Sequence, residues 1–75
     1  MIKEFDSVVL AVDLPEFGLT AGDIGTVVMI HGDNEGYEVE FMTLDGKTLA
    51  VTSRLASDVR PISQGEIAHV RLVAA

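Results

Sequence analysis

Hydrophobic and polar residues alternate with a period of two in the middle of the chain. The segment "YEVEF", Tyr37–Phe41, is the clearest case. Successive side chains of a strand point to opposite faces, so this alternation predicts a half-buried strand. We expect one set of its side chains in the core and the other in solvent: Tyr37, Val39 and Phe41 inward, Glu38 and Glu40 outward.

Other segments predict four more strands. "TLAVT", Thr48–Thr52, alternates in the same way and predicts a strand with Leu49 and Val51 facing the core. Two β-branched, apolar runs predict strands that are buried on both sides, and a short segment predicts a last strand. These three are Ser7–Val12, Thr26–Ile30 and Asp58–Ile62. Pro61 confines the last strand to an edge or a strand end, because proline has no backbone N–H.

The connections between these segments carry turn residues. "GDNEG", Gly32–Gly36, suits a hairpin turn, and "LDG", ending at Gly46, suits a tight one. Asp13–Asp23 forms a long, mostly polar loop, and Ser53–Ser57 fits one helical turn. Five short strands in this order predict an all-β fold, a small SH3-like barrel. We expect a single domain over residues 1–75, with the barrel at about 5–62 and a C-terminal tail at 63–75.

The segment "AGDIGTVV" lies where the long loop meets the second predicted strand. Gly22 and Gly25 permit backbone conformations or close contacts that a Cβ would hinder. Asp23 is placed to accept hydrogen bonds from nearby backbone amides. We therefore interpret this segment as a corner of the barrel and not as a phosphate-binding loop.

The tail ends in "EIAHVRLVAA", Glu66–Ala75, which is more apolar than the loops. Its pattern fits an extra strand, with Val70 and Leu72 on one face, and also a short helix. The segment either folds back on its own barrel or pairs with an edge of another copy. We favour the second alternative, so Val70 and Leu72 are candidates for a homo-oligomer contact.

The charge of the chain is strongly acidic and unevenly distributed. The formal net charge is −7, and residues 1–45 hold ten acids against one lysine. Nucleic-acid affinity comes largely from basic groups that neutralise phosphates, so a nucleic-acid partner is disfavoured. A basic protein partner is attracted instead. The four bases of the second half, Lys47, Arg54, Arg60 and Arg71, leave a nucleic-acid-binding barrel as an alternative.

Few residue patterns suggest chemistry. The chain has no cysteine and only two histidines, His31 and His69, and neither forms a close metal-binding pair. The serines have no nucleophile-elbow context, and a barrel of this size has little room for a cleft. We expect no catalytic, metal or cofactor site. The sequence shows no secretory signal and no apolar run of about 20 residues, so we expect a cytoplasmic protein without a membrane segment.

Two surfaces remain as candidates for binding a protein partner. Glu38 and Glu40, near Asp33 and Glu35 in the preceding turn, form the densest acidic patch, and Glu35, Glu38 and Glu40 are its candidate binding residues. Phe17 and Leu19 lie in the long polar loop, where they either anchor a partner or plug the end of the barrel. We favour the plug.

The segment "DSVVLAVDLPEFGLTAGDIGTVVMI", followed by "GYEVEFMTLDGKTLAVTSRLASDVRPI", resembles a family of short bacterial proteins of unknown function. The shared pattern is "DLPE–GL–AGD–GTVV" followed by "VRP", and the resemblance covers about residues 5–71. It implies an SH3-like barrel and lends no established activity. The sequence therefore predicts a non-catalytic protein-interaction module, such as an acidic antitoxin, an immunity-type factor or an accessory factor of a mobile genetic element. The alternatives are a nucleic-acid-binding barrel and a structural oligomer.

Overall fold

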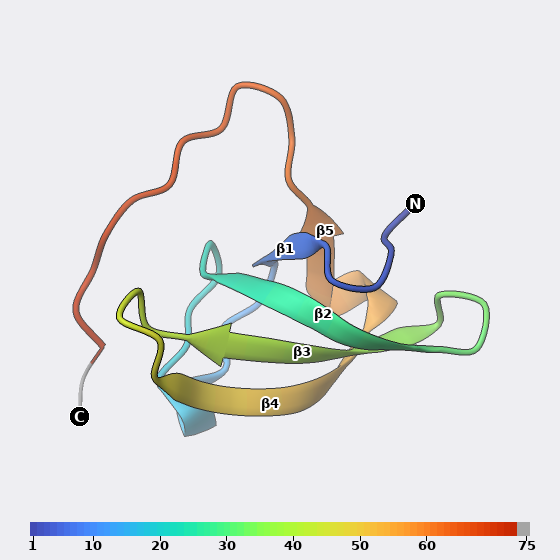
Figure 1. Ribbon diagram of the computed structural model, residues 1–75, viewed down its shortest axis with the longest axis horizontal. Helices are drawn as coiled ribbons and strands as arrows, with labels where there is room; N and C mark the ends of the chain where they lie inside the picture. The colour runs from blue at the N-terminus through green and yellow to red at the C-terminus, as the bar shows by residue number, and fades with distance from the viewer. Residues whose placement is uncertain (74–75) are drawn as a thin grey trace.

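The computed structural model describes residues 1–73 and contains one antiparallel sheet of five strands (Figure 1). Along the sheet, the strand order is β4-β3-β2-β1-β5. Two single-turn 3-10 helices connect strands, η1 in the long loop and η2 before β5. The elements are β1 Ser7–Leu10, η1 Pro15–Phe17, β2 Ile24–His31, β3 Gly36–Met42, β4 Thr48–Leu55, η2 Ala56–Asp58 and β5 Val59–Pro61.

All five predicted strands are present, and the predicted all-β, barrel-like class is confirmed. β2, β3 and β4 form two successive hairpins, and the short strands β1 and β5 continue the sheet beyond β2. The predicted helical turn lies later than expected, at Ala56–Asp58, because β4 continues to Leu55. β1 is shorter than expected and ends at Leu10.

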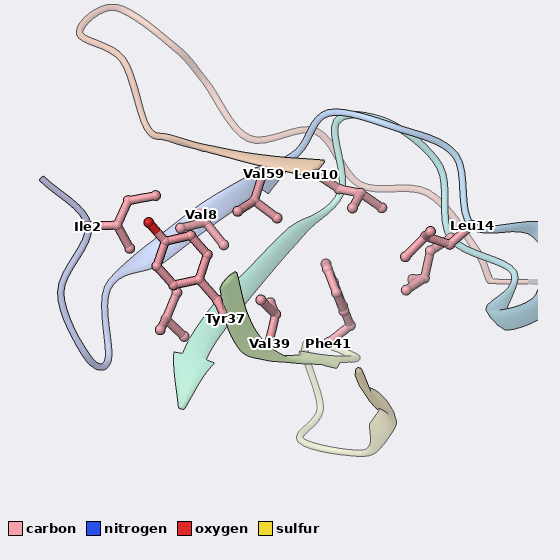
Figure 2. Packing of buried hydrophobic residues seen from close by; sticks show 10 residues of the cluster. Ile2, Val8, Leu10, Leu14, Tyr37, Val39, Phe41 and Val59 are labelled. Carbon is pink, nitrogen blue, oxygen red and sulfur yellow. The ribbon is translucent and has the colours of Figure 1, made fainter. Parts of the chain in front are cut away.

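The core lies between the inner faces of this curved sheet. Figure 2 shows that side chains from β3 point toward those of β1 and β5. As predicted, Tyr37, Val39 and Phe41 are buried, while Glu38 and Glu40 alternate with them on the outer face. The largest fully buried side chains are Phe41, Leu10, Val8, Val27 and Val39.

The segment "AGDIG" forms the predicted corner, and its two glycines are needed for different reasons. Gly22 has a φ of +100°, in the region that favours glycine. Gly25 lies in β2 against β3, and a Cβ there would be 2.6 Å from Val39 Cγ1 and 2.8 Å from Phe41 Cε1. The Asp23 carboxylate accepts a hydrogen bond from the Thr20 backbone N–H at 2.8 Å, which fixes the loop as expected.

Two β-bulges change which side chains face the core. In β4 the register shifts between Phe41↔Ala50 and Met42↔Thr48, so Leu49 is an additional residue on that strand. The extra residue inverts the alternation, and Ala50 and Thr52 face inward. Leu49 packs against the core as predicted. The inward prediction for Val51 is wrong, because its side chain is 55% exposed.

A second bulge lies in β2. The pairing moves from Val27↔Val39 to Met29↔Glu38, which makes Val28 the additional residue. Val27 is fully buried, but Met29 is half exposed on the outer face. The prediction that Thr26–Ile30 is buried on both sides is therefore wrong, since the outer face of β2 is open to solvent.

The described part of the tail, residues 63–73, is neither a strand nor a helix, so both predicted forms are wrong there. Pro61 ends β5 without an N–H to offer, and the chain leaves the sheet. It arcs away from the barrel and returns near the β3–β4 hairpin (Figure 1). Ala74 and Ala75 lie outside the described residues. Within residues 1–73 there is no helix of the length and hydropathy needed to cross a bilayer.

Candidate functional site

The outer face of β2, β3 and β4 carries the acidic residues of the predicted patch. Strand register places Thr26, Glu40 and Val51 in one row across the three strands. The next row consists of Met29, Glu38 and Ser53. We call Glu38 and Glu40, on the middle strand of this surface, the acidic face. The structure thus brings two of the three predicted acids together on one side of the sheet.

Hydrogen bonds hold Glu38 in place. Its Oε2 accepts from Ser53 Oγ on β4 and lies 2.8 Å from His31 Nε2 on β2. The hydrogen bond from Ser53, followed by that from His31, lowers the pKa of Glu38 below its usual value. Glu38 is therefore ionised at neutral pH.

Glu40 is held in a similar way by the same neighbouring strand. Its Oε2 accepts a hydrogen bond from Thr48 Oγ1 at 2.7 Å. Both carboxylates of the acidic face are thus bonded to hydroxyl groups of β4, the strand at the end of the sheet. Both side chains thus reach across to β4, and Glu38 also contacts His31 on β2.

Glu35, the third predicted acid, is exposed in the turn that precedes β3. Its side chain lies over Gly32, where a Cβ would overlap Glu35 Oε1. The Glu35 carbonyl accepts a hydrogen bond from the Ala56 N–H at 3.1 Å. Glu35 therefore extends the negative charge to the end of the β2–β3 hairpin without joining the two rows of the acidic face.

Phe17 and Leu19 have different environments although they are two residues apart. Leu19 is 3% exposed and packs in the core, and its backbone pairs with Leu14 across the loop. It plugs the barrel and offers no surface to a partner. Phe17 lies in η1 and is 38% exposed.

Val70 and Leu72 lie on the tail and are 72% and 95% exposed. Arg71, between them, donates from Nε to Asp23 Oδ1 at 2.9 Å, and its Nη2 bonds to Asp23 Oδ2 and to the Gly18 carbonyl. Partial burial alone would raise the pKa of Asp23, but the bonds from Arg71 and Thr20 outweigh it, and the pKa is lowered. No local pattern indicates this contact, since the two residues are 48 positions apart.

The anchored tail forms one wall of an apolar groove of about 570 Å³. Ile24 of β2 and the hairpin residues Met42 and Leu44 form the facing wall. A second anchor holds the start of the tail, where Arg60 bonds to both carboxylate oxygens of Glu66. The predicted apolar residues thus lie beside the barrel without being covered by it.

The arginines of the second half are neutralised within the chain. Arg60 and Arg71 form the ion pairs described above, and Arg54 Nη1 lies 3.8 Å from Asp58 Oδ2. When the three arginines and their acidic partners are set aside, two lysines and nine acids of the sequence remain. The basic patch considered for nucleic-acid binding therefore has no unpaired arginine within residues 1–73.

The cluster of Ser53, Glu38 and His31 does not have the geometry of a nucleophilic triad. Ser53 Oγ donates its hydrogen bond to the carboxylate and not to the imidazole. In a triad the imidazole accepts the hydroxyl proton and the carboxylate orients the imidazole. Within residues 1–73, no group of three His, Asp or Glu side chains is placed to hold a metal ion.

Comparison with known proteins gives one match. Residues 4–61 match the family described as "Domain of unknown function (DUF4926)". The chain belongs to this family. The predicted membership in an uncharacterised family is confirmed, but the match ends at Pro61, the last residue of β5, and leaves the tail outside. No curated protein and no solved structure matches the chain.

Proposed function

We propose that this DUF4926 chain is a non-catalytic protein-binding module whose acidic face binds a basic protein. The observation that carries the proposal is the arrangement of Glu38 and Glu40, two neighbouring carboxylates held on an open strand face by β4 hydroxyls. No arginine or lysine side chain is paired with either of them within residues 1–73. With a net charge of −7, the surface attracts a basic partner and repels phosphates.

The concrete form of the proposal is an antitoxin, immunity-type or accessory factor that masks the basic surface of a nuclease. Such a factor needs surface complementarity and charge, and no catalytic group of its own. The charged groups of this chain lie outside a core of apolar side chains, where a partner can reach them, and this supports the proposal. Neutralising the acidic face must then weaken binding more than an equal change of charge elsewhere.

The test is affinity capture from lysate of the source cells with three immobilised proteins: wild type, Glu38→Gln/Glu40→Gln, and the control Glu4→Gln/Glu16→Gln. Glu4 precedes β1 and Glu16 lies in η1, and both are exposed away from the acidic face. Because each variant neutralises two acids, the control has the same net charge as the first variant. We expect at least one basic protein whose recovery falls tenfold or more with the first variant only. Its recovery should also fall between about 50 and 500 mM salt. Equal recovery on all three proteins would refute the proposal.

A second function is supported by the exposed tail. Ile67, Val70 and Leu72 are each at least 72% exposed, which is unusual for three apolar side chains within six residues. We propose self-association through the tail as the alternative role. Deletion of residues 66–75 should then reduce the mass measured by light scattering, and an unchanged mass with intact folding would contradict it.

A further inference from the structure

The two ends of the sheet differ in how they are protected against added strands. β5 has only three residues and ends in Pro61, two features that prevent pairing at an edge. β4, at the other end, has eight residues and contains no proline. Its one irregularity is the bulge at Leu49, near its first residue. From Ala50 onward, β4 is a regular strand with a neighbour on one side only.

The register shows which backbone groups of β4 point away from β3. The Ala56 N–H donates to the Glu35 carbonyl at 3.1 Å, which makes these two residues a hydrogen-bonded pair. The pairing continues without a shift to Phe41↔Ala50, and hydrogen-bonded pairs alternate along an antiparallel ladder. The backbone of Ala50, Thr52 and Arg54 therefore faces β3. The backbone of Val51, Ser53 and Leu55 faces outward.

Some of these outward groups have partners inside the chain. The Leu55 N–H donates to Asp58 Oδ2 at 3.3 Å, and the Ser53 carbonyl accepts from Arg54 Nε at 2.6 Å. Of the four outward groups of Val51 and Ser53, three have no partner within residues 1–73: the N–H and carbonyl of Val51 and the N–H of Ser53. These two donors and one acceptor are the groups that a further antiparallel strand would bond to.

The side chains of the same two residues lie on the outer face of the sheet, in the rows of Glu40 and Glu38. In an antiparallel pair, residues opposite one another place their side chains on the same face. A strand added to β4 would thus put the side chains opposite Val51 and Ser53 beside the acidic face. Its backbone would lie two strand spacings from β3, about 10 Å, a span that lysine and glutamate side chains cover together.

We propose that β4 accepts an extended basic segment of the partner as an antiparallel sixth strand. Lysine or arginine would occupy the positions opposite Val51 and Ser53, where Glu38 and Glu40 lean toward β4. This proposal rests on the proposed function and names its binding mode. A second copy is a poorer occupant, because each chain carries a net charge of −7 and pairing at β4 would bring two acidic faces together.

The experiment uses the full chain and a synthetic nine-residue peptide that alternates lysine and valine. Hydrogen exchange of individual amides is followed by NMR with and without saturating peptide. We expect exchange at Val51 and Ser53 to slow at least tenfold, while Ala50, Thr52 and Arg54 are protected already in the free protein. Peptide binding that leaves Val51 and Ser53 unprotected would overturn strand addition.

Two N-methylated peptides distinguish strand addition from simple charge attraction. Methylation of the lysine amides removes the donors that face β4 and should weaken binding at least tenfold, whereas methylation of the valine amides should leave it unchanged. If both peptides bind equally and only Glu38→Gln/Glu40→Gln weakens their binding, strand addition is wrong. Binding by the acidic face is then retained as the proposed function. If no peptide binds and the captured proteins do not depend on the acidic face, the proposed function fails as well. A dimer mass in light scattering that the peptide abolishes would replace the partner by a second copy.

Discussion

Gly25 provides the sharpest test of the barrel corner, because the space beside its Cα has room for a hydrogen atom but not for a methyl group. In Gly25→Ala the new methyl group would lie 2.6 Å from Val39 Cγ1, 2.8 Å from Phe41 Cε1 and 3.0 Å from the Glu40 carbonyl oxygen. Val39 is 0% and Phe41 is 1% exposed, so both side chains are enclosed by the core and cannot move aside. β2 must therefore shift away from β3.

The expected loss of stability follows from this crowding. Adding a methyl group to a packed core costs about 1 to 3 kcal/mol, and three hard contacts place this case at about 3 kcal/mol. A chain of this length has a free energy of unfolding of roughly 4 to 11 kcal/mol. Each kcal/mol shifts the Tm of such a domain by about 4 to 8 °C, so Gly25→Ala should lower Tm by about 12 to 24 °C.

Gly22→Ala is the matched control, since the same methyl group meets no atom within 4 Å there. Its cost comes from the φ of +100° alone and should be about 1 kcal/mol. Thermal and urea unfolding of both variants, followed by circular dichroism, measures the difference. The reasoning is refuted if Gly25→Ala is no less stable than Gly22→Ala.

Two further predictions concern the core and the tail. Phe41→Ala should lower the free energy of unfolding by about 3 to 5 kcal/mol and Val51→Ala by less than about 1 kcal/mol, because only Phe41 is buried; similar losses in urea unfolding would contradict the bulge in β4. The pKa of Glu66 is lowered from 4.5 to about 2 by its hydrogen bonds to Arg60 and to the Ser63 N–H. A lowered pKa in the folded state means that this stabilisation is complete above about pH 4.5 and is lost as the pH falls toward 2. A carbon-13 NMR titration of Glu66 that gives an ordinary midpoint would show that the ion pair is not formed.

The sequence pattern was sufficient for the strands and for the corner. Tyr37, Val39 and Phe41 alternate with two glutamates, and this period of two is a direct consequence of strand geometry. The outward position of Glu38 and Glu40 followed from the same pattern. Gly22 and Gly25 were recognisable because few other residues tolerate a positive φ or a close approach between strands.

Other features depend on contacts that no local pattern encodes. The bulges at Val28 and Leu49 insert one residue each. An inserted valine or leucine looks like any other strand residue, which is why a simple period of two predicts Val51 to face inward. Phe17 and Leu19 look alike in the loop sequence, and only the folded chain shows that Leu19 is buried and Phe17 is exposed. The bond from Arg71 to Asp23 joins distant segments, and the open side of β4 is visible only once the strand order is known.

The unequal ends of the sheet also bear on aggregation. A filament grows by strand pairing only if each added domain has a second unpaired strand edge for the next domain. β5 does not provide one, because it is short and ends in Pro61. Whichever segment pairs with β4, the β5 edge stops further strands from being added to the sheet. One domain can thus bind one segment without polymerising, although the edge of β4 is long and unpaired.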